Sequence, residues 1–362
     1  MSGERTNAAI RSGVAQVVTG QDLSRETMTS IVREIMAGGA TPAQVGGLLV
    51  GLAAKGETLE EIVGAAAAMR EAVIPIATSR TPLVDTCGTG GSGIARRNVS
   101  TATALVLAAC GVGTAKHGNR GISSKCGSAD VLAALGVDIT ASPERVAACI
   151  DEVGVGFLFA PSLHPAMRHA AGPRRELGIR TIFNLLGPLT NPAGVRRQVV
   201  GVYDPRRCAD LAGALGALGS ERVFVVHGLR SGAEPTTAAA PGIDDLSTEG
   251  PSLVAEYRDG EVRTHVLRAA DAGLNEHPWA ELAGEDAAGN AAALRRLLGG
   301  EAGAYRAAVQ LSGALALLVA GDGELSELPE KAAEIGAAID SGAALAVLER
   351  LVACSRGTPQ AS

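Results

Sequence analysis

The sequence lacks the features that mark several classes of protein. No apolar run approaches the roughly 20 residues of a membrane span, and the first residues, MSGERTNAAIRSG, contain no apolar segment of a secretory signal. Basic residues are not in excess, because 32 Lys and Arg stand against 38 Asp and Glu. General nucleic-acid binding requires clustered basic residues and is therefore disfavoured. We expect a cytoplasmic protein without nucleic-acid or membrane partners.

Cysteine pairs and aromatic residues are also scarce. The six cysteines lie far apart without a Cys-x-x-Cys pair, which disfavours a zinc knuckle and a redox dithiol. One Trp, three Tyr and four Phe against 47 Gly indicate tight turns and packing of small residues. The apolar fraction of 46% excludes a disordered chain, and 362 residues suffice for about two domains with buried cores.

Residues 1–78 are expected to form a small all-helical domain. Apolar residues recur at helical spacing between Met28 and Met36. Thr41-Pro42-Ala43-Gln44 and Thr58-Leu59-Glu60-Glu61 are capping boxes, which begin two further helices. The sequence thus predicts three short helices and no strand in this region.

Residues 79–362 are expected to form an α/β domain with a mostly parallel central sheet. Short β-branched runs alternate with helical stretches, which is typical of that class. Strands are predicted at residues 83–85, 113–115, 156–159, 199–202 and 223–226. The Asp259-Gly260 turn predicts an antiparallel hairpin, and alanine- and leucine-rich segments after Gly284 predict two to four closing helices.

Two glycine-rich loops follow neighbouring predicted strands. The first, residues 85–93, precedes a helix, whose free N–H groups and dipole favour a phosphate. For this loop alone, a turn without a ligand is an equally good interpretation. The second, residues 115–130, contains Lys116 and Lys125, two of only four lysines in the chain, with an arginine and three serines. Together the loops predict one ligand with more than one phosphate group.

Several motifs in and around these loops resemble the anthranilate phosphoribosyltransferase family. They are Gly88-Thr89-Gly90-Gly91, Asn98-Val99-Ser100-Thr101, Lys116-His117-Gly118-Asn119-Arg120 with Ser123-Ser124, Phe183-Asn184-Leu185-Leu186-Gly187-Pro188-Leu189-Thr190-Asn191-Pro192, Ala40-Thr41-Pro42-Ala43-Gln44 and Lys55-Gly56-Glu57-Thr58. Each motif alone is weak evidence, but together they are specific and span essentially the whole chain.

The resemblance implies a fold, a reaction and an assembly. The fold is a nucleoside phosphorylase-like phosphoribosyltransferase, with a helical dimerisation domain on which helices from about 164–192 pack. The reaction transfers the phosphoribosyl group of phosphoribosyl pyrophosphate (PRPP) to the amine of anthranilate, which yields N-(5-phosphoribosyl)anthranilate and pyrophosphate in tryptophan biosynthesis. The assembly is a homodimer.

The resemblance also implies the site residues. PRPP would be bound by Gly88, Gly91, Ser92, Arg96, Asn98, Val99, Ser100, Thr101, Lys116, Ser124 and Ser128. Anthranilate would be bound by Gly88, Asn119, His117, His164, Arg174 and Pro188. Magnesium, as two ions, would be held by Ser100, Asp244 and Asp245. No residue is assigned as a general base.

Each of these assignments has a structural alternative. A histidine alone more often has a structural role. Arg174 suits a benzoate carboxylate because its guanidinium can bind bidentately, but it could instead be a surface arginine that pairs with Glu176. An Asp-Asp pair on a loop, such as Asp244 and Asp245, is ordinarily only solvated.

The sequence departs from the family pattern at four places. Ser92 stands where the family usually has Asp, Arg96 where a small hydroxyl residue is common, and Asp245 where the family has Glu. An insertion at about 230–241 contains Glu234, an alternative metal ligand. We expect the added cations Arg96 and Arg97 to make the first loop more attractive to pyrophosphate and less dependent on metal.

The inferred mechanism is attack of a neutral aromatic amine on C1 of the ribose. Orientation and stabilisation of the departing pyrophosphate would supply the catalysis. The alternatives are a paralogue that acts on another aminobenzoate, a nucleoside phosphorylase-like enzyme, and a non-catalytic homologue that binds nucleic acid or regulates.

Overall fold

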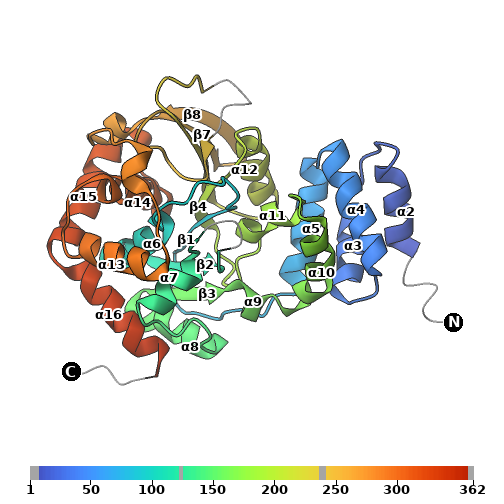
Figure 1. Ribbon diagram of the computed structural model, residues 1–362, viewed down its shortest axis with the longest axis horizontal. Helices are drawn as coiled ribbons and strands as arrows, with labels where there is room; N and C mark the ends of the chain where they lie inside the picture. The colour runs from blue at the N-terminus through green and yellow to red at the C-terminus, as the bar shows by residue number, and fades with distance from the viewer. Residues whose placement is uncertain (1–7, 122–124, 236–241, 358–362) are drawn as a thin grey trace.

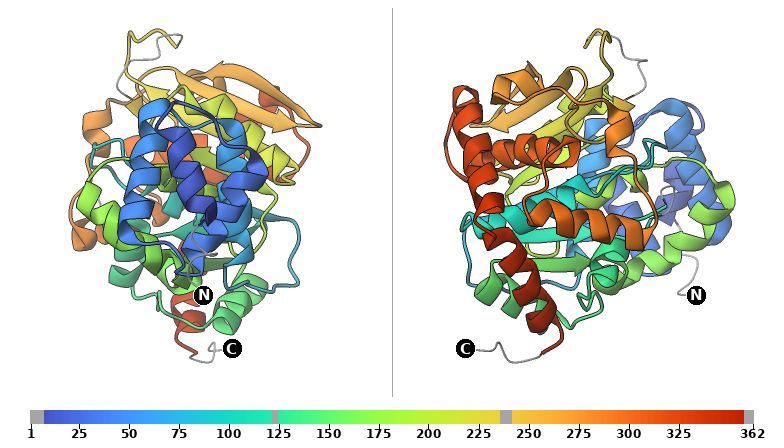
Figure 2. Two further views of the ribbon diagram at one scale, coloured as in Figure 1. Left: turned by 90° about the vertical axis from the view of Figure 1, so that its right-hand side faces the viewer. Right: turned by 60° about the vertical axis from the view of Figure 1, so that its left-hand side comes forward.

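The computed structural model describes residues 8–121, 125–235 and 242–357. Its first part is a bundle of four helices: α2 (Ala8–Val17), α3 (Arg25–Met36), α4 (Pro42–Lys55) and α5 (Leu59–Glu71). Figure 2 (left) shows this bundle in front of the rest of the molecule. The prediction of three helices is wrong, because it leaves out α2, which packs through a glycine: a Cβ on Gly13 would overlap the Ile31 side chain.

Both predicted capping boxes are confirmed. The Thr41 hydroxyl accepts from Gln44 N at 3.3 Å, and the Gln44 side chain accepts from Thr41 N at 2.8 Å. Thr58 and Glu61 exchange the corresponding pair of bonds. Such reciprocal bonds satisfy amide groups that a helix start leaves unpaired, so α4 and α5 begin where the sequence indicates.

A single eight-stranded sheet forms the centre of the α/β part, with the strand order β3-β2-β1-β4-β5-β7-β8 and β6 paired to β5. The strands are β1 (Leu83–Gly88), β2 (Gly113–Gly118), β3 (Val155–Phe159), β4 (Arg197–Gly201), β5 (Arg222–Leu229), β6 (Gly242–Ile243), β7 (Ser252–Arg258) and β8 (Glu261–Leu267). Strands β1 to β5 are parallel, and β6, β7 and β8 are antiparallel to their neighbours. The predicted α/β class, parallel strands and hairpin are confirmed.

Helices cover both faces of this sheet (Figure 1). One face packs on α6 (Val99–Ala109), α7 (Ser128–Ala134) and the four closing helices α13 (Ala287–Leu298), α14 (Ala304–Ala320), α15 (Leu328–Asp340) and α16 (Ala343–Ser355). The other face packs on α12 (Arg207–Ala217) and the N-terminal bundle. Residues of the central strands alternate between the two cores, since Val199 and Phe224 join the first and Val200 and Val225 the second.

Two helices from the middle of the chain pack on the N-terminal bundle. Helix α10 (Arg168–Leu177) contacts α3 and α4, and α11 (Phe183–Leu186) contacts α5. Ala170 and Phe183 belong to the same apolar core as the bundle. The short helices α8 (Pro143–Ala148) and α9 (Ala160–Leu163) flank β3. No helix in the described ranges has the length and apolarity to cross a membrane.

Candidate active site

The carboxyl ends of the parallel strands gather most of the sequence-predicted residues at one edge of the sheet. The predicted residues lie as follows: Gly88, Gly91, Ser92 and Arg96 at the end of β1 and in the loop after it; Asn98, Val99, Ser100 and Thr101 at the start of α6; Lys116, His117 and Asn119 at the end of β2; Ser128 at the start of α7; and His164 and Pro188 after α9 and α11. Ser124 lies outside the described residues. This edge is where ligands bind in open parallel sheets.

The acidic segment after β6 crosses the strand ends at very short range. A Cβ on Gly88 would lie 3.0 Å from the Asp244 carboxylate, and one on Gly201 would overlap the Asp244 carbonyl oxygen. A Cβ on Gly228 would lie 2.6 Å from the Asp245 carbonyl oxygen. Glycine at the ends of β1, β4 and β5 therefore allows this segment to lie directly over the sheet edge.

Arg96 bridges the two carboxylates of the acidic segment. Its guanidinium donates to Asp244 Oδ1 at 2.8 Å and to Asp245 Oδ2 at 3.2 Å, and its side chain is 8% exposed. The neighbouring Arg97 pairs with Glu285 at 2.7 Å. Both added cations are therefore paired with carboxylates in this structure, and the expectation that they attract pyrophosphate and reduce the dependence on metal stays a prediction.

The Asp244–Asp245 pair has the donor chemistry that magnesium uses. Mg²⁺ is bound by one or two protein carboxylates together with substrate phosphate oxygens, so two hard oxygen donors at a phosphate site suffice. Burial raises the pKa of Asp245 to about 6, and the Arg96 charge acts in the opposite direction. Within the described residues no cluster of three or more His, Cys, Asp or Glu forms a self-contained metal site. The alternative ligand Glu234 lies just before residues 236–241, which the structure does not describe.

The start of α6 is held by residues far away in the sequence. Asn98 Oδ1 accepts from Asn290 Nδ2 at 2.9 Å, and the Asn98 carbonyl accepts from the Tyr305 hydroxyl at 3.1 Å. Asn290 is buried and its own Oδ1 accepts from Arg97 at 3.0 Å. The buried Thr101 hydroxyl has no hydrogen-bond partner among the described residues. The helix start is thus rigidly placed and retains an unused donor.

Lys116 is a buried cation at the end of β2. Its ammonium donates to the His117 carbonyl oxygen at 3.0 Å, and the described residues place no carboxylate within ion-pair distance of it. The buried Asp85 accepts from His117 N at 3.1 Å and from Asn191 at 2.9 Å. Burial raises the pKa of Asp85, while the charge of Lys116 partly offsets that rise. The charge of Lys116 is therefore only partly compensated at this edge.

His117 and His164 form a buried pair beside the loop that contains Gly187 and Pro188. Their ring centroids are 5.0 Å apart. Burial, with the nearby His164 and Lys116, lowers the pKa of His117 to about 3, and burial lowers the pKa of His164 to about 4. Both rings are therefore neutral near pH 7, so the side chains of this pair are polar but uncharged.

Arg174 on α10 has no ion pair or hydrogen bond from its guanidinium in the described parts of the chain. The group lies 5.3 Å from the centroid of the Phe183 ring, and burial lowers its pKa. The alternative of a surface arginine paired with Glu176 is therefore wrong. A half-buried, unpaired guanidinium on an aromatic ring is suited to bind a carboxylate.

Comparisons with known proteins show the family of this chain. Residues 13–73 match the family model described as "Glycosyl transferase family, helical bundle domain", and residues 80–345 match "Glycosyl transferase family, a/b domain". An anthranilate phosphoribosyltransferase of Anaeromyxobacter sp. (strain K) is 49% identical over 346 residues, which cover 96% of this chain and 98% of the relative. The chain belongs to the anthranilate phosphoribosyltransferase family. The resemblance predicted from the motifs is confirmed.

Solved structures support the same family assignment. The anthranilate phosphoribosyltransferase from Thermus thermophilus is 45% identical, with a TM-score of 0.86 over 95% of this chain and 99% of that one. The enzyme from Saccharomyces cerevisiae in complex with PRPP and Mg is 25% identical, with a TM-score of 0.83 over 97% of this chain and 98% of that one. The nucleoside phosphorylase-like and non-catalytic nucleic-acid-binding alternatives are thereby disfavoured.

Sequence reasoning missed two residues at the edge of this candidate site. One is Asn290, which positions Asn98 from 192 residues away. The other is Arg180, whose guanidinium lies 4.1 Å from the centroid of the Tyr203 ring and donates to the Gly91 carbonyl. Neither lies in a recognisable motif, and both contacts are long-range, so the sequence carries no local signal for them.

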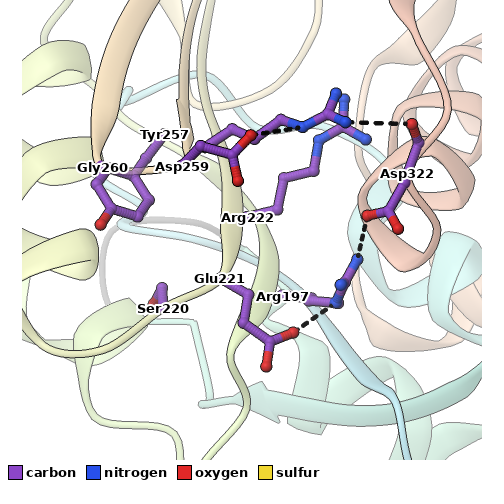
Figure 3. Close-up of a pocket in the computed structure, with 9 residues that line it drawn as sticks. Arg197, Ser220, Glu221, Arg222, Tyr257, Asp259, Gly260 and Asp322 are labelled. Carbon is purple, nitrogen blue, oxygen red and sulfur yellow. Dashed lines mark hydrogen bonds and ion pairs between the residues drawn. The ribbon is translucent and has the colours of Figure 1, made fainter.

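A hollow of about 530 Å³ lies at the opposite end of the sheet (Figure 3). Arg197, Arg222 and Arg258 line it where β4, β5 and β7 meet, and each is paired with a carboxylate at 2.8 Å. Its charges are therefore compensated within the protein, and it lies at the amino ends of the parallel strands. We assign no ligand to it.

Proposed function

We propose that this chain transfers the phosphoribosyl group of PRPP to the amine of anthranilate and releases pyrophosphate, as a step of tryptophan biosynthesis. One observation carries the proposal beyond the family assignment. The glycine-rich loop, the start of α6, Lys116 and the acidic pair meet at one edge of the sheet, with Asp244 directly over Gly88 and Gly201. The proximity of candidate anion donors and candidate metal ligands, which one pyrophosphate could use together, supports the proposal.

PRPP is assigned to the groups at the ends of β1 and β2. Amides of the 88–91 loop and the first turn of α6 would bind phosphate oxygens, because a helix start presents unpaired N–H groups. The unpartnered Thr101 hydroxyl and the ammonium of Lys116 would complete these contacts. Ser128 and the PRPP residues named from the resemblance belong to the same proposal.

Asp244, Asp245 and Ser100 would hold magnesium, which we expect as two ions. When bound, the metal supplies positive charge that stabilises the departing pyrophosphate oxygens. Lys116 adds a fixed positive charge beside that leaving group, and its burial strengthens the effect. The residues themselves therefore stabilise charge that develops as the bond from C1 to pyrophosphate breaks.

Anthranilate is assigned to the side formed by Asn119, His117, His164, Pro188 and Arg174. Arg174 would bind the carboxylate and so orient the amine. The aromatic amine is neutral at pH 7 and carries its own lone pair. The histidines are neutral and bonded to each other, so neither is assigned as a general base.

The assembly and location belong to the proposal as well. We expect a cytoplasmic homodimer that associates through the helical domain, residues 1–78. Sedimentation of the purified chain tests this expectation.

A substrate panel tests the reaction and its main alternative. The chain is incubated with PRPP, magnesium and either anthranilate, 3-aminobenzoate or 4-aminobenzoate, and the phosphoribosyl product is detected by mass spectrometry. We expect a product from anthranilate at a rate well above the others. A faster reaction with another aminobenzoate would assign the chain to a paralogous activity, and cleavage of a nucleoside by phosphate alone would reject the transferase.

A further inference from the structure

Arg96 occupies the place where the proposed function requires a metal ion. Its two terminal nitrogens bond one carboxylate each, Asp244 at 2.8 Å and Asp245 at 3.2 Å. A guanidinium is a cation with a fork of donors that matches carboxylate oxygens. The single positive charge of Arg96 therefore already compensates part of the negative charge of the two carboxylates.

In this arrangement one hydrogen-bond donor of Arg96 has no partner among the described residues. Its side chain is 8% exposed, and its Nε is buried without a hydrogen-bond partner among the described residues. A buried donor without a partner is unfavourable, and a second acceptor placed nearby would relieve it. A pyrophosphate oxygen near Arg96 would therefore gain a free donor at Nε and compete with the two carboxylates for the guanidinium.

The backbone around Arg96 is fixed, so the change requires the side chain alone. Arg97 N donates to the Leu282 carbonyl at 2.9 Å, and Gly284 N donates to the Ala95 carbonyl at 3.0 Å. A Cβ on Gly284 would overlap the Arg96 carbonyl oxygen, so the two segments lie in direct contact. The guanidinium can rotate between two acceptors while its Cα stays in place.

We propose that Arg96 is a resident counter-cation, which keeps divalent metal from the Asp244–Asp245 pair until the pyrophosphate of PRPP draws its guanidinium away. This inference rests on the proposed function, since it assumes that PRPP and metal share this edge. Arg96 exchanges two carboxylates for pyrophosphate oxygens, which are equally good acceptors for its fork. The acidic pair then becomes available at the moment when the substrate adds its own oxygen ligands.

The proposal has two consequences of opposite sign. Without PRPP, removal of the Arg96 charge leaves two unpaired carboxylates, so affinity for a metal ion alone rises. Without metal, the same removal takes a cation from the pyrophosphate, so affinity for PRPP falls. If Arg96 had a merely structural role, its removal would weaken the binding of both metal and PRPP, because a disordered loop binds every ligand less tightly.

Binding of Mn²⁺ alone, followed by the electron paramagnetic resonance signal of the unbound ion, tests the first consequence. We expect Arg96→Gln to bind Mn²⁺ at least about tenfold more tightly than the wild type. Arg96→Lys keeps one charge without the fork and should fall between them. Arg97→Gln removes the neighbouring charge, which pairs with Glu285 instead, and should match the wild type.

Calorimetric titration of PRPP in the presence of a chelator tests the second consequence. We expect Arg96→Gln to lose about tenfold in affinity for PRPP relative to the wild type. Neither experiment uses anthranilate or turnover, so both are independent of whether the transfer reaction occurs. Thermal unfolding verifies that each variant is folded. If Arg96→Gln does not fold, Arg96→Lys replaces it in both experiments. Unchanged or weaker Mn²⁺ binding by the folded variants would overturn the proposal.

Discussion

His164 Nε2 lies 3.1 Å from His117 Nε2, and His117 Nδ1 lies 3.1 Å from the carbonyl oxygen of Gly187. A carbonyl oxygen only accepts, so His117 carries its proton on Nδ1 and donates it there. His117 Nε2 is then an acceptor, and His164 donates to it from Nε2. This chain of two bonds requires His117 to be neutral, because its Nε2 accepts, and the lowered pKa of each ring keeps both rings neutral near pH 7.

The histidine pair should make the fold sensitive to mild acid. Because both pKa values are lowered, to about 3 and about 4, the unfolded chain binds more protons than the folded chain below pH 6.5. Stability is fully present above that pH and decreases as the pH falls. We expect a loss of about 2 kcal/mol for each histidine between pH 7 and pH 5. Urea unfolding at pH 7 and at pH 5 measures this loss of stability.

A double variant separates this effect from other acid-labile groups. His117→Asn retains a donor toward Gly187, and His164→Gln retains one toward residue 117, but neither titrates. We expect the double variant to lose less stability between pH 7 and pH 5 than the wild type. His277→Gln, at a partly exposed histidine beside Glu281, is the control. An equal loss in all three proteins would contradict the account.

Arg174 should govern the affinity for anthranilate alone. Arg174→Lys retains the charge but removes the bidentate fork, so KM for anthranilate should rise about tenfold or more while KM for PRPP stays constant. Arg175→Lys changes the exposed neighbour and should have no effect. Steady-state kinetics with each substrate varied in turn measure both constants. Equal changes in the two variants would remove Arg174 from the site.

Asn290 should act on PRPP through Asn98. Asn290→Ala leaves Asn98 and Arg97 without their shared partner, so KM for PRPP should rise more than KM for anthranilate. Loss of buried hydrogen bonds should also lower the free energy of unfolding by about 1–3 kcal/mol. Glu285→Gln, at an exposed carboxylate, should change neither quantity much. A fall in stability without the KM difference would make Asn290 purely structural.

Gly201 should be needed for the position of Asp244. In Gly201→Ala, the new methyl group would overlap the Asp244 carbonyl and displace the acidic segment. A displacement of this kind should lower kcat/KM by about 100-fold. Gly46→Ala in α4, where a Cβ meets nothing within 4 Å, should retain activity and gain up to about 1 kcal/mol of stability. Full activity in Gly201→Ala would contradict the close passage of the Asp244 segment over the end of β4.

Local signals account for the part of the fold that could be predicted from the sequence. Thr41 and Thr58 mark helix starts because their capping bonds span only three residues. Asp259 and Gly260, with φ of 53° and 84°, mark the hairpin because few residues adopt that conformation. Helix α2 was missed because Gly13 contributes space for Ile31, and a missing side chain leaves no apolar signal.

The gathering of the candidate site residues at one edge of the sheet could be predicted from the sequence, but the pairing among them could not. Arg96 and Asp244 are 148 residues apart, and only the strand order and the close crossing at Gly201 bring them together. From the sequence alone Arg96 is an added cation of the first loop, whereas in the structure it bridges Asp244 and Asp245. Long-range pairing of this kind depends on tertiary packing, which local patterns do not specify.

The decrease of anthranilate fluorescence with PRPP and magnesium tests the central claim most directly. The account predicts a rapid decrease with the wild type and a rate at least about 100-fold lower with Asp244→Asn, which removes a carboxylate from the proposed metal site. Asp322→Asn, an exposed acid at the opposite end of the sheet, should react like the wild type. A wild-type protein that binds PRPP but leaves anthranilate unchanged, or an unimpaired Asp244→Asn, would contradict it.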